Sequence, residues 1–245
     1  MNPIIQSLFD RKSCRIFKDK EISQEERKLI LEACMQAPSA GNQQMYTIID
    51  VQDKKLQETL SKTCDNQPFI NQAEMVLIFC ADFQKWYDLF NHENCNPRKP
   101  GVGDLLLATT DATIAAQNAV VAAESLGIGS CYIGDILEQH DIHKELLNLS
   151  ECVVPVCMLV LGYPAEDHFK RQKPERCKLE DIVCVNQYHR KNKQELKNMF
   201  EHKAVNKTLN EWATAFCNRK YNSDFSKEMT KSVQKYIDQF KSEAD

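Results

Sequence analysis

The sequence predicts one globular domain in which helices alternate with buried strands, followed by a charged helical tail. With 245 residues, 42% of them hydrophobic and 27% charged, the chain is long enough to bury one substantial core. Short apolar runs bounded by turn residues are typical of buried strands, and apolar residues at intervals of three or four indicate the helices.

Two helices are predicted near the N-terminus, with a cation-rich stretch between them. IIQSLFDRK has apolar residues at helical spacing, which places RKSCR (residues 11–15) where the first helix ends. Ser23 and Glu26 form a capping box for the second helix, and Pro38 ends its pattern. The loop PSAGNQQ follows.

Four segments have the composition of strands. MYTIIDV (45–51) and EMVLIFCA (74–81) flank a helix-like KKLQETLSK, and the second run is apolar almost throughout, which favours the centre of a sheet. IGSCYIGDI is a short strand that enters a tight glycine turn. In CVVPVCMLVLGYP (152–164), Pro155 suggests an edge strand or a bulge.

DLLLATTDATIAAQNAVVAAESLG (104–127) is the longest apolar-rich segment. Polar residues interrupt it, among them Asp111 and Glu124, and a charge near the centre of a membrane span would be costly. We therefore expect a buried helix ended by Gly127 and covered on several sides, within one subunit or between two, and no membrane association.

The charge changes sign along the chain. Residues 1–185 carry 19 Lys and Arg against 27 Asp and Glu, a net charge of −8, whereas residues 186–245 carry 12 against 8, a net charge of +4. Nucleic-acid binding needs a broad basic surface, so an acidic body disfavours it, and the excess of cations in the tail is too slight to favour it.

The 11 cysteines are scattered, and they include no Cys-x-x-Cys pair. Since no secretory segment precedes them, we expect reduced thiols and a cytoplasmic protein. His140 and His143 are the one close histidine pair, but no cysteine lies at ligand spacing, so we predict a solvated helix there and no metal site.

Several ordered motifs resemble the flavin-dependent nitroreductase family. The resemblance is carried by RKSCRIFKDKEISQEERKLILEACMQAPSAGNQQMYTII, IAAQNAVVAAESLGIGSCYIGDI and VVPVCMLVLGYPAED with KPERCKLEDIV. CDNQPF, FCADF and the helical C-terminal extension are similar to the branch that contains oxygen-insensitive NADPH nitroreductases and FMN reductases. The resemblance covers residues 4–188 well and the C-terminal tail only loosely.

This resemblance implies an α+β fold with a mainly antiparallel central sheet flanked by helices. It further implies an intertwined homodimer with two FMN molecules at the subunit interface. Residues 1–188 would form the FMN-binding core, and residues 189–245 would form a charged helical extension that packs on the core or on the partner subunit.

In family terms, Arg11, Lys12, Ser13 and Arg15 match the cluster that holds the FMN phosphate and ribityl chain. A dianionic phosphate needs several converging donors; Arg supplies a planar fork and Ser a short hydroxyl. Without the family motifs, the same stretch would be interpreted as a basic helix end, where cations suit the helix dipole.

The resemblance also places three polar side chains near the flavin. Ser39 and Asn42 match a loop that reaches it from the partner subunit, although the same residues are common in ordinary turns. Gln67 matches a position that faces the ribityl or pyrimidine side, where an amide can donate and accept; the alternative is a solvated loop Gln.

The turn SCYIGD matches one whose backbone N–H groups lie against the flavin, which implicates Tyr132, Ile133 and Gly134. Gly allows close backbone approach, and an N–H near the ring would stabilise reduced flavin. Asp135 stands where close relatives often have a second Gly, so local charge or loop shape would differ.

RQKPERCKL is the last expected cofactor segment. The family usually has Lys-Pro-Arg, whereas Glu175 here separates Pro174 from Arg176. Arg176 is therefore the better phosphate ligand, and the extra residue shifts Lys173 relative to the family position.

The implied activity is transfer of hydride from NAD(P)H via flavin N5 to flat acceptors, namely nitroaromatics, quinones or free flavin, by a ping-pong mechanism. FMN carries this chemistry, so no catalytic residue is expected. Arg219 and Lys220 would bind the nicotinamide 2′-phosphate, unless they only end a solvated helix. The alternative function is a non-catalytic flavin or phospholigand-binding protein.

Overall fold

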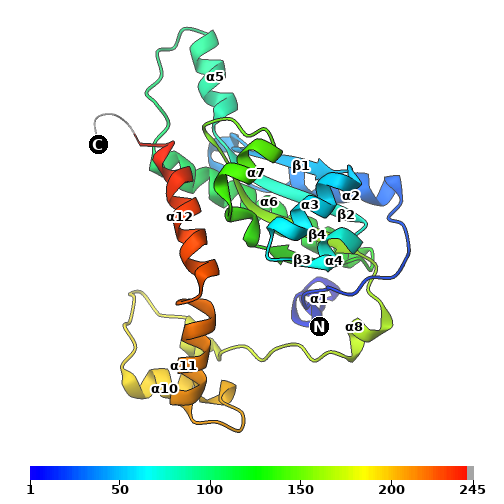
Figure 1. Cartoon of the computed structure of the whole chain (residues 1–245), viewed down its shortest axis with the longest axis vertical. Coiled ribbons are helices and arrows are strands. Elements are labelled where there is room, and N and C mark those ends of the chain that lie inside the picture. Colours follow the sequence, from blue (N-terminus) through cyan, green and yellow to red (C-terminus); the bar gives the residue numbers. More distant parts are fainter. Residues whose placement is uncertain (242–245) are drawn as a thin grey trace. The chain divides into compact units, whose positions relative to one another are not determined.

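Four antiparallel strands form the central sheet of the computed structural model, which describes residues 1–241 (Figure 1). The strands are β1 (Tyr46–Val51), β2 (Met75–Asp82), β3 (Gly129–Ile133) and β4 (Val153–Gly162), in the order β1-β2-β4-β3. All three neighbouring pairs are antiparallel, which confirms the expected α+β fold. β1 and β3 are the edge strands.

β2 is buried on both faces, as its unbroken apolar run predicts. Leu77 and Phe79 belong to one hydrophobic cluster and Ile78 to the cluster on the other face. Opposite β2, the register of β4 shifts: Phe79 pairs with Cys157, but Cys80 pairs with Pro155. Because β4 lies inside the sheet, Pro155 marks a bulge and not an edge.

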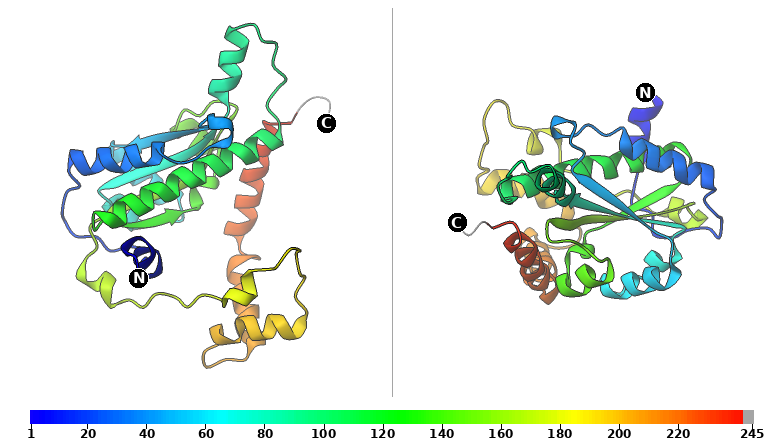
Figure 2. Two further views of the ribbon diagram at one scale, coloured as in Figure 1. Left: turned by 180° about the vertical axis from the view of Figure 1, so that it is seen from behind. Right: turned by 90° about the horizontal axis from the view of Figure 1, so that it is seen from above.

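Helices cover both faces of the sheet. α2 (Gln24–Met35) and α6 (Val102–Ser125) cover one face, and α3 (Lys54–Thr63), α4 (Pro68–Gln72) and α7 (His140–Leu146) lie on the other (Figures 1 and 2). The capping box at the start of α2 is present, since the Ser23 and Glu26 side chains bond each other's backbone N–H groups.

α6 is the one helix in the described part of the chain that is long and apolar enough to cross a membrane. Ala112, Ala116 and Ala119 are fully or almost fully buried against the sheet, where their small side chains allow close packing. The helix ends before Gly127, whose φ of +73° is the left-handed conformation expected after a helix. The prediction of a buried core helix is confirmed.

The remaining elements are mostly short. They are α1 (Pro3–Asp10), η1 (Ala40–Asn42), α5 (Gln84–His92), η2 (Asp135–Leu137), α8 (Glu166–Lys170), α9 (Leu179–Ile182), α10 (Lys193–Phe200), η3 (Glu201–Lys203), α11 (Leu209–Lys220) and α12 (Asp224–Asp238). As predicted, α1 ends immediately before the RKSCR stretch.

The chain forms two compact units, Lys173–Glu228 and the residues on either side of it. This division does not coincide with the predicted one at residue 188. The end of the tail belongs with the sheet because Tyr236 and Phe240, each 1% exposed, pack in a hydrophobic cluster with residues of the sheet and α6. The Ser232 hydroxyl also accepts a hydrogen bond from the His140 N–H at 3.0 Å.

The prediction of a solvated helix at His140 and His143 is wrong. His143 is fully buried: its Nδ1 lies 2.9 Å from the Ile136 carbonyl oxygen and its Nε2 lies 2.8 Å from the Thr63 hydroxyl. These contacts connect α7 to α3. The residues described contain no group of three or more His, Cys, Asp or Glu side chains able to hold a metal ion.

Candidate functional site

The cation-rich segment lies along edge strand β3. The Cys14 N–H donates to the Ser130 carbonyl oxygen at 2.8 Å, and Phe17 forms an isolated antiparallel bridge with Pro164. A Cβ on Gly129 would lie only 2.8 Å from the Cys14 Cβ, so this position of β3 needs glycine. The backbone of the segment is therefore anchored to the sheet on both sides of Arg15.

Arg11, Ser13 and Arg15 converge on the middle of β3. Burial raises the pKa of the Cys131 thiol, while the charge of Arg15, a hydrogen bond with the Ser13 side chain and the charge of Arg11 act in the opposite direction. The Arg11 charge also acts on the neighbouring Tyr132. The structure thus brings together three of the four residues predicted to hold the phosphate.

One donor in this cluster has no protein acceptor. Among residues 1–241, Nη1 of Arg11 is buried and makes no hydrogen bond. A buried guanidinium nitrogen without an acceptor is costly, whereas an oxyanion would satisfy it with a charge-assisted bond. The cluster therefore fits a phosphate group.

Lys12 is directed to a different part of the chain. Its ammonium donates to the carbonyl oxygens of Phe169, at 3.4 Å, and Arg171. These bonds tie the RKSCR stretch to α8 and the residues after it. The predicted contact of Lys12 with the cofactor stays a prediction.

Gln67 is two residues before Phe69, and the Phe69 ring contacts Arg15 of the cluster. The Arg15 guanidinium lies over the Phe69 ring, 5.8 Å from its centroid. Nε2 of Gln67 donates to the Cys64 carbonyl oxygen at 2.9 Å, which fixes the amide and leaves its carbonyl oxygen as the group available to a ligand.

The turn after β3 is accessible at its glycine. The Ile133 side chain is buried in the core, and the Tyr132 hydroxyl donates to the Gln117 side-chain oxygen of α6 at 3.3 Å. A Cβ built on Gly134 would meet no atom within 4 Å, so open space adjoins this backbone. A ligand can approach the turn there.

The loop that contains Ser39 and Asn42 precedes the opposite edge strand, β1. The Ser39 hydroxyl accepts a hydrogen bond from the Gln44 N–H at 3.0 Å. The Gln43 carbonyl oxygen accepts one from Trp86 Nε1 at 2.8 Å. Asn42 is exposed, with a left-handed φ of +56°. β1 and β3 are separated by two strands, about 14 Å at the usual strand spacing. The loop and the RKSCR stretch thus flank opposite edges of one sheet.

Asp111 holds this loop to α6. Its carboxylate accepts from the N–H groups of Ala40 and Met45, although the residue is only 2% exposed. Sequence reasoning treated Asp111 only as a polar interruption of an apolar helix. A buried acid in such a helix requires donors, and that requirement was the available signal.

Lys173 and Arg176 lie at the start of the second unit, Lys173–Glu228, in a stretch without regular secondary structure. Lys173 is half-buried and Arg176 is exposed. Their contacts with the cofactor stay predictions.

Arg219 and Lys220 form the end of α11. The Arg219 guanidinium lies 5.5 Å from the Phe216 ring centroid, and the Lys220 ammonium lies 5.9 Å from that of Phe225. Both cations are exposed and suit the negative end of the helix dipole. This geometry matches the alternative of a helix end and leaves the nucleotide contact untested.

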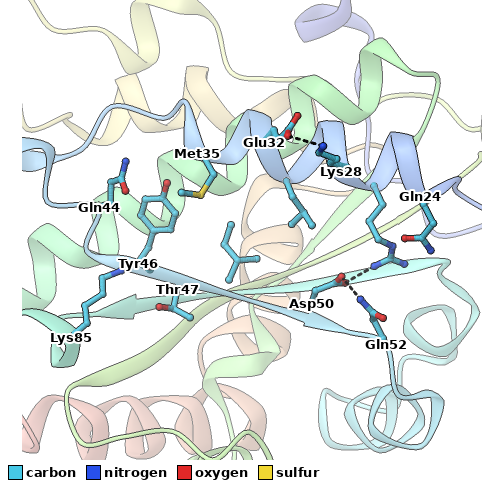
Figure 3. Close-up of a pocket in the computed structure, with 13 residues that line it drawn as sticks. Gln24, Lys28, Glu32, Met35, Gln44, Tyr46, Thr47, Asp50, Gln52 and Lys85 are labelled. Atoms are coloured by element: carbon cyan, nitrogen blue, oxygen red, sulfur yellow. Dashed lines mark hydrogen bonds and ion pairs between the residues drawn. The ribbon is translucent and has the colours of Figure 1, made fainter.

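A separate groove of about 570 Å³ lies between α2 and the open edge of β1 (Figure 3). Its lining comes mainly from these two elements: Gln24, Arg27, Lys28, Leu31, Glu32, Met35, Gln44, Tyr46, Thr47, Ile48, Asp50, Gln52 and Lys85. It includes none of the residues predicted to bind the cofactor.

The charges in the groove are already matched within the chain. Lys28 lies 3.6 Å from Glu32 (Figure 3). Arg27 pairs with Asp50, and the Lys85 ammonium donates to the Tyr46 carbonyl oxygen at 2.7 Å. Burial lowers the pKa of Lys85. With its cations paired, the groove is a poorer phosphate site than the cluster beside β3.

Comparison with known proteins identifies the family of the chain. Residues 8–163 match the model of the nitroreductase family. The chain is 39% identical over 179 residues to an FMN reductase [NAD(P)H] of Bacillus subtilis, covering 71% of this chain and 70% of that protein. It is 35% identical over 189 residues to the oxygen-insensitive NADPH nitroreductase of Salmonella typhimurium, covering 77% and 75%.

Solved structures show the same fold. B. megaterium NfrA2 superposes with a TM-score of 0.85 at 31% identity, covering 99% of this chain and 100% of that one. The NADPH:FMN oxidoreductase of Vibrio harveyi in complex with NAD+ superposes with a TM-score of 0.81 at 25% identity, covering 96% and 98%.

Proposed function

Because the chain belongs to the nitroreductase family, we propose that it is an FMN-dependent oxidoreductase that uses NAD(P)H to reduce flat acceptors such as nitroaromatics, quinones or free flavin. The names of its relatives, an FMN reductase and an NADPH nitroreductase, support this activity. The observation that carries the proposal is the buried Arg11 nitrogen that lacks an acceptor in the described part of the chain, next to Ser13 and Arg15.

The residues beside β3 would hold the cofactor. Arg11, Ser13 and Arg15 would bind the phosphate through charge-assisted hydrogen bonds, and the free carbonyl oxygen of Gln67 would accept from the ribityl or ring side. The open backbone at Gly134 would admit the ring edge. Bound FMN supplies the redox chemistry by accepting hydride from a nicotinamide and passing electrons to the acceptor.

We propose that the active form is a homodimer. Ser39 and Asn42 precede β1 while the phosphate cluster lies beside β3, so a second copy would bring the two groups to one cofactor. Apolar side chains are also exposed: Phe9 of α1 is 64% exposed and Leu106 of α6 is 63% exposed. Burying such side chains stabilises an interface.

The proposed activity is tested with purified protein. We expect a yellow dimer with about one FMN per chain, whose 450 nm absorbance bleaches with NADPH and returns when a nitroaromatic or quinone is added. A colourless protein that cannot be reconstituted with FMN would overturn the proposal. A yellow protein that never bleaches with either nucleotide would be a non-catalytic flavin-binding protein.

The phosphate site is tested by substitution. Arg15→Ala should weaken FMN binding by about 1.5–3 kcal/mol, the range for hydrogen bonds to charged groups. Lys18→Ala is the matched control, because Lys18 is an exposed cation of the same segment. Arg176→Ala should weaken binding similarly, and Lys173→Ala less, since Glu175 separates the Lys-Pro pair from Arg176. Unchanged affinity in Arg15→Ala and Arg176→Ala would place the phosphate elsewhere.

A further inference from the structure

All residues that line a second pocket belong to the unit Lys173–Glu228. α10 and α11 border an open hollow of about 710 Å³, within the range of small-molecule sites. Its apolar lining includes Leu196, Phe200, Leu209 and Trp212. None of the residues predicted to bind FMN lines it, so it is distinct from the site beside β3.

The aromatic wall of this pocket is preformed. Trp212 stacks on Phe200, with ring centroids 6.2 Å apart and planes inclined by 23°, and on Phe216, at 5.2 Å and 24°. The indole is therefore held from two sides. A wall of fixed rings favours flat aromatic ligands, since little side-chain freedom is lost when they bind.

Two lysines on α10 add positive charge to the pocket. Lys193 and Lys197 are four residues apart, so they lie on one helix face, and both line the pocket. Within residues 1–241, neither ammonium makes a hydrogen bond or an ion pair. Like charges at this spacing destabilise a helix, and a bound anion would relieve the repulsion.

The one acid of α10 does not neutralise them. The Glu195 carboxylate accepts from the Asn192 N–H at 2.7 Å and lies 2.9 Å from His189 Nε2. These bonds lower the pKa of Glu195 and hold it at the start of the helix. The lysine charges therefore remain available to a ligand.

We propose that this pocket binds flat aromatic carboxylates, with the ring against the wall formed by Trp212 and Phe200 and the carboxylate between Lys193 and Lys197. The proposal does not depend on FMN binding or on reductase activity. A small aromatic anion suits the pocket because the preformed aromatic surface lies beside two lysines that have no acceptor within residues 1–241.

Tryptophan fluorescence offers a direct test. The chain has two tryptophans, so Trp86→Phe leaves Trp212 as the only indole. In this background, 4-nitrobenzoate added to the FMN-loaded protein without nicotinamide should quench emission saturably. The neutral 4-nitrobenzyl alcohol, which keeps the nitrophenyl ring, should bind about tenfold more weakly, because two ion pairs are lost.

Variants of the lysines complete the test. Lys193→Ala with Lys197→Ala should raise the Kd for 4-nitrobenzoate about tenfold, whereas the matched pair Lys203→Ala with Lys207→Ala, outside the pocket, should not. All four substitutions are on or near the surface, and circular dichroism checks that the helices persist. Equal Kd values for the two double variants, or equal quenching by acid and alcohol, would overturn the proposal.

Discussion

The buried carboxylate of Asp111 accepts a hydrogen bond from the Met45 N–H at 3.2 Å, and its other oxygen accepts from the Ala40 N–H at 3.0 Å. One side chain on α6 thus holds both ends of the loop that carries Asn42. Three of the loop's residues, among them Asn42, have left-handed φ values, a conformation that needs such support.

Asp111→Ala should lower the free energy of unfolding by about 1–3 kcal/mol, because two backbone donors lose their acceptor in a buried site. It should also weaken FMN retention, since Ser39 and Asn42 would no longer be positioned. Urea unfolding and flavin absorbance measure the two effects. Thr113→Ala, an exposed change on the same helix, should alter stability by no more than about 0.5 kcal/mol. Equal stability of the two variants would contradict this role.

The cysteines should differ sharply in reactivity. Burial raises the pKa of Cys34, Cys64 and Cys80 to about 12, so these thiols stay protonated at neutral pH as well as being inaccessible. Cys95, Cys184 and Cys217 are exposed. Alkylation of the native protein at pH 8 followed by peptide mass spectrometry should therefore modify these three exposed cysteines first. Early labelling of Cys64 would show that the core opens readily.

Acid should weaken the contact between α12 and α7. The pKa of Asp141 is lowered to about 2, first by its bond with the Lys235 ammonium and then by His140. Because the folded pKa lies below the unfolded value near 3.9, this contribution is present above pH 4 and is lost as the pH falls towards 2.

Unfolding of Asp141→Asn should accordingly show a smaller stability loss between pH 4 and pH 2 than the parent protein. Urea titrations at pH 7, 4 and 2.5 measure the difference. Asp19→Asn is the control, because Asp19 is exposed and forms no ion pair with another residue in 1–241. Parallel pH profiles for the parent and Asp141→Asn would refute the assignment.

The cations at the end of α11 give a test of nucleotide choice. If Arg219 and Lys220 bind the 2′-phosphate, replacing both with Ala should raise the KM for NADPH about tenfold or more, leave NADH use nearly unchanged and spare the FMN content. Steady-state kinetics with both nucleotides measure this. Equal losses with both would indicate a disturbed tail, and no loss with either would leave the pair as a helix end beside Phe216 and Phe225.

Local patterns in the sequence were sufficient to predict the helices and strands of the sheet domain. The apolar run of β2, the Ser23 and Glu26 box and the position of Gly127 each act within a few residues, and the structure has them as predicted. The resemblance to known motifs predicted the antiparallel α+β fold and the RKSCR cluster. These features depend on neighbours in the chain or on ordered motifs, both of which a sequence records directly.

Only the tertiary structure decided which residues meet. Pro155 could mark an edge or a bulge until β4 was placed inside the sheet, and His143 looked solvated because its partner Thr63 is 80 residues away. The role of Asp111 likewise depends on N–H groups about 70 residues earlier. Burial and hydrogen bonding are properties of the packed chain, so the periodicity of one segment does not report them.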